Sequence, residues 1–278
     1  MLQTISVFFN TVFVFPINNL LVMFYKIFLF IKLPGAFGFA IIALTLLIRF
    51  ILHPFFKQQM DTAKKMQDIK PHLDHLSKKH KQDPKKLQEE QMKLYQRVGL
   101  NPASGCLFMI IQIPVFIALY QTLQLFLLNG KATKIIEQIN KSLYHSSLKI
   151  TSIDPWFFGI NLAVTPAKGG HWLYYAIPVI TAILQYFQTQ VTMPASAPKP
   201  TSQIESGASQ KDKKTNTSGD FQQAMNMQMK YFFPLMIGWF SMNLPVGLAL
   251  YWNIFSLFTI AQYKRDVKSK NLNVKTTS

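Results

Sequence analysis

Residues 229–262 read MKYFFPLMIGWFSMNLPVGLALYWNIFSLFTIAQ, and this stretch decides the fold. No charged residue occurs from 231 to 263. A helix of that length is about 50 Å long, which is less than the roughly 60 Å that two full bilayer crossings need. The sequence NLP at 243–245 interrupts the run near its middle. We therefore predict two short membrane helices, at 225–244 and 245–263, joined by a tight turn.

The composition of the whole chain agrees with a membrane protein. Hydrophobic residues make up 49% of the 278 positions and charged residues only 15%, which is not typical of a soluble enzyme. The 29 Lys and Arg exceed the 12 Asp and Glu, but they occur in blocks between long uncharged tracts. A nucleic-acid module spreads its basic charge over a soluble face, so we expect no DNA partner. Because Cys106 is the single cysteine, the sequence excludes a disulfide framework and a cysteine-based metal cluster.

Three further apolar runs complete the predicted membrane domain. They lie at 34–56, 101–128 and 172–190, and each is long enough to cross about 30 Å of hydrocarbon as a helix. Asn101 and Pro102 are suited to begin the second of these helices. The fold class that we predict is all-α: a polytopic membrane protein with a core of five transmembrane helices.

The N-terminal segment, residues 1–33, is apolar but contains several residues that disfavour a simple span. These include Pro16, Asn18, Asn19 and Lys26. We predict an interfacial amphipathic helix at about 16–32. A sixth span is the alternative. A cleaved signal peptide is disfavoured because the segment has no basic start and no small-residue cleavage site.

Charge in the connections sets the predicted orientation. The 57–100 connection and the 264–278 tail are rich in Lys and Arg, which places both in the cytoplasm. With five spans, the N-terminal side of the first span and the 129–171 loop are then extracytoplasmic. The 191–224 loop is cytoplasmic, and its Ser, Pro, Lys and Thr content predicts disorder.

The 57–100 connection itself has the pattern of a helical hairpin. Apolar residues recur at three- and four-residue steps in both halves, and Pro71 is expected to bend the first helix. Asp83 and Pro84 are suited to cap and begin the second helix. The remaining faces are basic. They are either a solvated surface that fixes topology or a docking surface for a ribosome, a targeting factor or acidic lipid headgroups.

Arg49 is the residue that physical reasoning singles out. It is the one Lys, Arg, Asp or Glu in the span 34–56, where an arginine costs about 2.5–3.5 kcal/mol on insertion scales. Its guanidinium either reaches back to the cytoplasmic interface or faces a water-filled cavity shared with other polar groups. No Asp or Glu lies within a predicted span as a fixed partner. The polar candidates inside apolar stretches are Gln112, Gln121, Gln124, Gln185, Gln188 and Asn253.

Enzymatic chemistry is not indicated. His72, His75 and His80 lie on a lysine-rich helix, a pattern more typical of a solvated face than of a metal site. The spans hold no Asp pair and no Ser–His pair at matching depth for proteolysis, and no glycine-rich phosphate loop is present. We expect no catalytic residue, no cofactor and no metal.

Several stretches together resemble the YidC/Oxa-type membrane protein insertase family. They are LTLLIRFILHPF at 44–55, MQDIKPHLDHLSKKH at 66–80, NPASGCLFMIIQIPVFIALYQTL at 101–123, and the 229–262 stretch quoted above. The resemblance covers about residues 17–263 and implies five core helices around a hydrophilic groove that opens to the cytoplasm and to lipid. It implies that Arg49 is the groove arginine, and that Gln185 or Gln188, with Trp252, are groove positions.

The resemblance also implies a function and a location. The expected function is to insert nascent membrane proteins and help them fold, alone or with a Sec translocon, in a bacterial plasma membrane. A ribosome or targeting factor is expected at the hairpin and basic tail. The chain resembles the short form of the family, without a large extracytoplasmic domain. A small transporter for an anionic substrate is the rival hypothesis, although we find no repeat symmetry for a midplane site.

Overall fold

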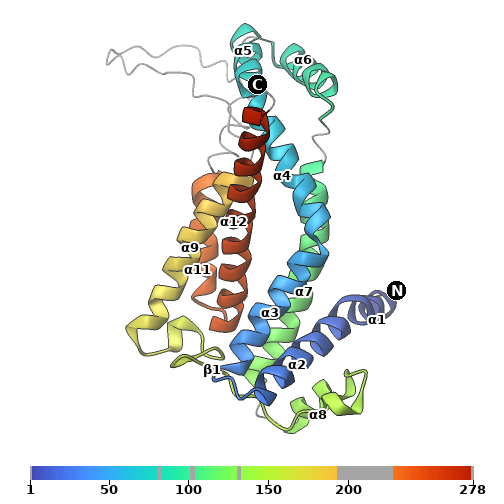
Figure 1. Cartoon of the computed structure of the whole chain (residues 1–278), viewed down its shortest axis with the longest axis vertical. Coiled ribbons are helices and arrows are strands. Elements are labelled where there is room, and N and C mark those ends of the chain that lie inside the picture. Colours follow the sequence, from blue (N-terminus) through green and yellow to red (C-terminus); the bar gives the residue numbers. More distant parts are fainter. Residues whose placement is uncertain (1, 81–82, 101–103, 130–132, 193–227, 277–278) are drawn as a thin grey trace.

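The computed structural model describes residues 2–80, 83–100, 104–129, 133–192 and 228–276. These residues form an elongated, mostly helical molecule whose long helices follow its long axis (Figure 1). A short helical hairpin lies at one end, and a loop region with one small β-hairpin lies at the other. Most of the loop predicted to be disordered at 191–224 and the start of the helix predicted at 225–244 fall outside the described residues, but Val191 and Thr192 belong to a helix that begins at Trp172, so the predicted loop starts two residues too early.

The N-terminal segment is a nearly continuous helix. It consists of α1 (Leu2–Phe9), a π-helical turn (Asn10–Val14) and α2 (Phe15–Phe30), and it crosses the long helices obliquely (Figure 1). Asn18 and Asn19 face the protein, with 2% and 6% of their surface exposed, whereas Gln3, Thr4, Ser6 and Thr11 nearer the N-terminus are exposed. The opposite face is apolar and exposed, as at Phe8 and Ile27. Asn19 bonds to the backbone of Ser142 and Tyr144, which fixes this helix against the loop region.

The stretch predicted as the first span contains a bend. Helix α3 (Ala36–Ile51) and helix α4 (His53–Asp68) meet at Leu52 with an angle of 68°. The helix expected over 34–56 is therefore broken at Leu52, and α4 continues past the expected end to Asp68. Pro54 supplies the physical reason, because a proline suits a first helical turn but its ring clashes with the preceding turn of a continuing helix.

The hairpin region consists of the outer part of α4, α5 (Lys70–Lys79) and α6 (Pro84–Arg97). The chain breaks at Ile69, two residues before Pro71, where the sequence predicts a bend. Asp83 caps α6 by accepting a hydrogen bond of 3.0 Å from the backbone N–H of Lys86, which confirms the predicted cap.

The remaining long helices are α7 (Ser104–Asn129), α9 (Trp172–Thr192) and α12 (Val246–Thr276), and the short helix α11 (Phe233–Ser241) precedes α12. A π-helical turn (Gln228–Phe232) precedes α11. The chain reverses between α11 and α12 at residues 242–245, as the sequence predicts. Gly238 lets α11 approach α9 closely, because a Cβ there would lie 2.7 Å from the Cβ of Ala182.

The loop region joins several helices at one end of the molecule. It contains α8 (Thr133–Lys141), two short 3-10 turns (Ser146–Leu148 and Pro166–Lys168), and strands β1 (Trp156–Phe157) and β2 (Ile160–Asn161). The antiparallel pair, with Trp156 opposite Asn161, is a small exception to the all-α prediction. The loop also caps α12, since the N–H groups of Val246 and Gly247 donate to the carbonyl oxygens of Val164 and Leu162.

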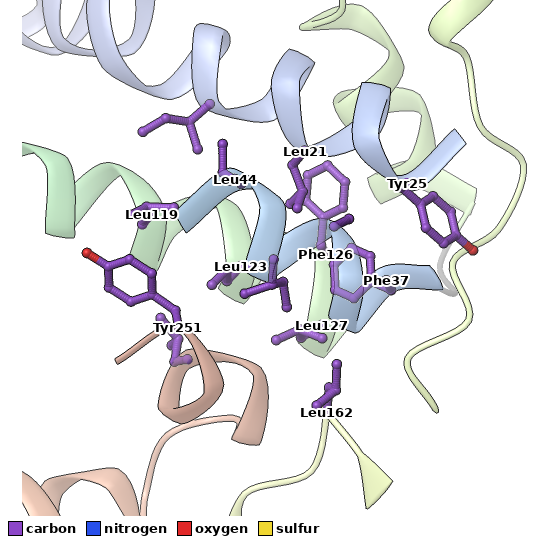
Figure 2. Packing of buried hydrophobic residues seen from close by; sticks show 14 of the residues in the cluster. Leu21, Tyr25, Phe37, Leu44, Leu119, Leu123, Phe126, Leu127, Leu162 and Tyr251 are labelled. Carbon is purple, nitrogen blue, oxygen red and sulfur yellow. The ribbon is translucent and has the colours of Figure 1, made fainter. Parts of the chain in front are cut away.

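Apolar side chains of four elements pack together beside this loop region. Leu21 and Tyr25 of α2 meet Phe37 and Leu44 of α3, with α7 behind them (Figure 2). The rings of Phe37 and Phe126 stack at 6.1 Å. This core holds α2, α3, α7 and the start of α12 in fixed positions, and it therefore fixes the places of the polar residues beyond it. The other labelled members are Leu119, Leu123, Leu127, Leu162 and Tyr251.

Length and hydropathy single out few spans. Within the described part of the chain, the helix Gln3–Phe30 is long and apolar enough to cross a membrane, and α3 with α4 is a second candidate if the bent pair counts as one span. Polar residues such as Gln185 and Gln188 lower the hydropathy of α9, and α11 is short. The five-span arrangement therefore stays a prediction.

Candidate substrate-binding site

Arg49 lies in the last turn of α3 with 1% of its surface exposed. Its guanidinium carbon is 3.8 Å from the ring centre of Phe56 and 3.7 Å from that of Phe255, so the cation is held between two aromatic faces. The Nη2 group donates a hydrogen bond of 3.0 Å to the carbonyl oxygen of Phe255. Arg49 is thus clamped between α4 and α12.

This clamp only partly satisfies the charge. Among the described residues, the Nε and Nη1 groups of Arg49 have no hydrogen-bond partner. No Asp or Glu precedes Asp61 in the sequence, and the described residues place no carboxylate within ion-pair distance of the guanidinium. Desolvated cation–π contacts stabilise by about 2 kcal/mol, less than the several kcal/mol that burial of an ion costs. The contacts in this conformation therefore compensate the buried charge incompletely.

Two glutamines of α9 pair with α12 beside this clamp. The Trp252 Nε1 group donates to Gln185 Oε1 at 2.7 Å, and the Ser256 hydroxyl donates to Gln188 Oε1 at 2.5 Å. The second pair lies one helical turn further along both α9 and α12 than the first pair. They form a polar seam between α9 and α12, which we call the glutamine seam.

A third glutamine reaches α12 from the other side. Gln112 of α7 donates a hydrogen bond of 3.3 Å to the Tyr251 hydroxyl. Trp252 also packs edge-to-face on Phe116 of α7 at 5.1 Å. The Oδ1 atom of Asn253 is buried without a hydrogen-bond partner. Helix α12 is thus the common element, because it contacts the predicted polar residues of α3, α7 and α9.

The other polar candidates are placed differently. Gln121 is exposed and Gln124 is half-buried, and no hydrogen bond joins either to the clamp or to the glutamine seam. Arg49 is covered by rings in this conformation, so a water-filled cavity around it remains a prediction about a more open state.

Sequence reasoning missed the partners of these residues. Phe56 and Phe255 complete the clamp, Ser256 completes the glutamine seam, and Tyr251 is the partner of Gln112. Phe255 and Ser256 follow Trp252 by three and four positions, so helical spacing alone could have placed them near one face. Nothing local in the sequence relates Arg49 to Phe255.

Helix α4 is fastened to α12 beyond the clamp. His53 Nδ1 and Gln262 Nε2 are 3.0 Å apart, and the Tyr263 hydroxyl donates to Gln67 Oε1 at 3.3 Å. Both contacts lie on the α4 side of the bend at Leu52. A movement of α4 about this bend has to break them, and it carries Phe56 away from Arg49.

An open pocket of about 330 Å³ lies between α5 and α6 of the hairpin. His72, His75 and Arg97 line it, together with Glu90 and Lys93. The last two form an ion pair of 2.8 Å, and their hydrogen bond and opposite charges lower the pKa of Glu90 and raise the pKa of Lys93. No group of three His, Cys, Asp or Glu that could hold a metal ion occurs among the described residues.

Helices that expose apolar faces and bury a clamped arginine, with paired glutamines between them, define a helical membrane protein with a polar interior. Comparison with known families gives the particular class. Residues 28–267 match the model of the family described as 60Kd inner membrane protein. The chain therefore belongs to the YidC/Oxa family of membrane protein insertases, as the sequence motifs predict.

Individual relatives differ in length. This chain is 28% identical to "Membrane protein insertase YidC" of Oceanobacillus iheyensis. The match covers 94% of this chain and 85% of that protein. It is 30% identical to "Membrane protein insertase YidC 2" of Bacillus anthracis over 91% of the chain and 78% of that protein. It is also 30% identical to "Inner membrane ALBINO3-like protein 1, chloroplastic" of Chlamydomonas reinhardtii over 80% of the chain. The chain spans 42% of the length of this relative and 50% of the length of "Inner membrane ALBINO3-like protein 2, chloroplastic" of the same organism.

Proposed function

We propose that this chain inserts nascent membrane proteins, with Arg49 as the transient partner of acidic or polar client residues. The observation that carries the proposal is the clamp itself: a buried guanidinium with two donor groups unpaired and no fixed anion in the described part of the chain. A permanent ion pair would leave no capacity for a client. A cation balanced only by rings and one carbonyl oxygen can exchange these contacts for a passing carboxylate.

The clamp suggests how a client gains access. Movement of α4 about Leu52 lifts Phe56 from the guanidinium, and the polar atoms of the glutamine seam lie beside the opened site. A client segment can then exchange hydrogen bonds with protein groups instead of losing them to hydrocarbon, where each unpaired polar group costs several kcal/mol. Charge-assisted contacts of about 1.5–3 kcal/mol are weak enough to release the client.

The same proposal includes the arrangement in the membrane. Five spans place the α5–α6 hairpin and the basic tail in the cytoplasm. There they can contact a ribosome, a targeting factor or a Sec translocon. The N-terminal side of α3 is then extracytoplasmic, in a bacterial plasma membrane. Membrane potential assists an acidic client tail by about 2.3 kcal/mol per charge per 100 mV.

The test is an insertion assay with matched substitutions. Arg49→Met removes the buried cation, whereas Lys57→Met removes an exposed cation eight residues later. We expect Arg49→Met to reduce insertion of a single-span client with an acidic tail roughly tenfold, since one charge-assisted bond is lost. A neutral-tail client and the Lys57→Met variant should be affected much less. Unchanged insertion by Arg49→Met, with loss of anion flux instead, would support the transporter.

A further inference from the structure

An exposed aromatic patch lies at the end of the molecule opposite the α5–α6 hairpin, where the end of α2 and the β1–β2 hairpin are found (Figure 1). Phe39 joins the two parts, because its ring lies 6.0 Å from Phe28 of α2 and 5.9 Å from Phe158. The large apolar side chains of the patch are exposed by 50% to 88%: Phe30, Ile31, Trp156 and Phe158.

The β1–β2 hairpin is held firmly at its base. The Tyr174 hydroxyl of α9 accepts a hydrogen bond of 3.0 Å from the N–H of Asn161, and the Tyr25 hydroxyl of α2 accepts one of 3.0 Å from the N–H of Asp154. Phe157 packs so closely on α3 that a Cβ at Gly38 would lie 2.2 Å from its ring. The exposed side chains are therefore presented by a fixed support and not by a free loop.

The backbone of the patch is strained at both parts. Lys32 (φ 54°) and Phe158 (φ 47°) are the non-glycine residues with left-handed φ in the described part of the chain. Lys32 follows the end of α2, where glycine is usual, and Phe158 occupies the two-residue turn with Gly159. Strained conformations of this kind concentrate at functional sites. Here the strained turn holds an aromatic side chain that is 72% exposed.

We propose that the aromatic patch inserts into the interfacial layer of the phospholipid bilayer and anchors this end of the protein. Aromatic side chains favour that layer, where an apolar ring meets hydrated headgroups. The patch continues the outward face of α2, on which Ile27 is 47% exposed. Lys32 is also exposed and supplies a cation to lipid phosphate. The anchor requires the membrane location of the family and is independent of client binding at Arg49.

The test measures the surroundings of Trp156 directly. The substitutions Trp172→Phe, Trp239→Phe and Trp252→Phe leave Trp156 as the single tryptophan. The full chain is placed in vesicles of phosphatidylcholine and phosphatidylglycerol, with bromine near the headgroup or near the acyl-chain end. We expect quenching of Trp156 fluorescence to be about twofold stronger from the shallow bromine than from the deep one, because tryptophan lies at headgroup level.

Two other results would overturn the proposal. Quenching by aqueous acrylamide, without an effect of either brominated lipid, means that the patch lies in water. Protection from both quenchers means that protein covers it, for example a second copy of the chain. The control chain carries Met92→Trp on α6 together with Trp→Phe substitutions at all four native tryptophans. Acrylamide should quench the fluorescence of its single tryptophan, and neither brominated lipid should.

A second measurement avoids the tryptophan substitutions. A spin label at Phe158→Cys, with Cys106→Ser, retains all four tryptophans. If the turn is in the bilayer, oxygen should increase the spin relaxation rate of the label more than a water-soluble nickel chelate does. The reverse order would contradict the anchor even if the triple variant did not fold.

Discussion

The guanidinium of Arg49 donates to the carbonyl oxygen of Phe255 at 3.0 Å and lies 3.7 Å from the centre of that residue's ring. One residue of α12 thus supplies both a polar acceptor and an aromatic face to a cation of α3. The same carbonyl oxygen also accepts a hydrogen bond of 2.8 Å from the Thr259 hydroxyl. Because the acceptor is shared and the ring contact is weak, a client carboxylate can compete for the guanidinium.

Removal of the buried cation should reduce insertion without lowering the stability of the fold. We expect Arg49→Met to unfold in detergent at the same denaturant concentration as the parent, or a higher one, because an incompletely compensated ion is replaced by an apolar side chain. Arg49→Lys keeps the charge but loses the planar face that packs between two rings, so it should be less stable than Arg49→Met. Denaturant unfolding of both variants checks this order, and a clear destabilisation of Arg49→Met alone would contradict it.

A cross-link between α4 and α12 should strongly reduce insertion. In a chain with Cys106→Ser, the pair His53→Cys and Gln262→Cys replaces two side chains that are in contact at 3.0 Å. A short, reducible bifunctional thiol reagent should lower insertion roughly tenfold, and a reductant should restore it, because Phe56 can no longer leave Arg49. Each single-cysteine variant is the control. Full insertion by the cross-linked protein would show that α4 need not move.

The glutamine seam should show strong coupling between partners. Gln188→Leu leaves the buried Ser256 hydroxyl without its acceptor and should cost about 1–3 kcal/mol of unfolding free energy. The double variant Gln188→Leu with Ser256→Ala removes both polar groups and should recover most of that loss. A double-mutant cycle by denaturant unfolding measures the coupling. Additive effects would mean that the hydrogen bond of 2.5 Å contributes little.

Asn19 should control the docking of the N-terminal helix. Its side chain bonds to the Ser142 carbonyl at 2.9 Å and to the Tyr144 N–H at 2.7 Å. Asn19→Ala should favour local opening by about 2 kcal/mol and accelerate tryptic cleavage at Lys149 roughly thirtyfold. Thr11→Ala is the matched control, because its hydroxyl bonds only within its own helix. Equal cleavage of both variants would contradict this docking.

The sequence predicts features that depend on neighbouring residues. Helical spacing and capping residues located the α6 start at Asp83, and the cost of a charge in an apolar run singled out Arg49. The bend at Leu52 was missed although Pro54 signals it, because the apolar run continues through both helices. Asn18 and Asn19 indicated an unusual N-terminal helix, but not that their side chains turn inward.

The partners of the site residues could not be predicted because they depend on tertiary packing. Phe255 meets Arg49 across 206 positions of sequence, and Gln188 meets Ser256 across 68. Many apolar and polar residues of α12 could have faced α3 or α9 equally well. The strained turn at Phe158 was also invisible, since a phenylalanine in a loop gives no signal of left-handed φ.

Photocrosslinking beside an intact Arg49 tests whether the acidic tail of a client meets the guanidinium. Benzoylphenylalanine replaces Phe56, whose ring covers the guanidinium, or Phe50, which is 78% exposed on the same stretch of chain. With a stalled client that has an acidic tail, we expect crosslinks to the tail from position 56 and not from position 50, and Arg49→Met should abolish them. Equal crosslinking from both positions, or crosslinks from position 56 that do not depend on Arg49, would contradict the proposed role of the clamp.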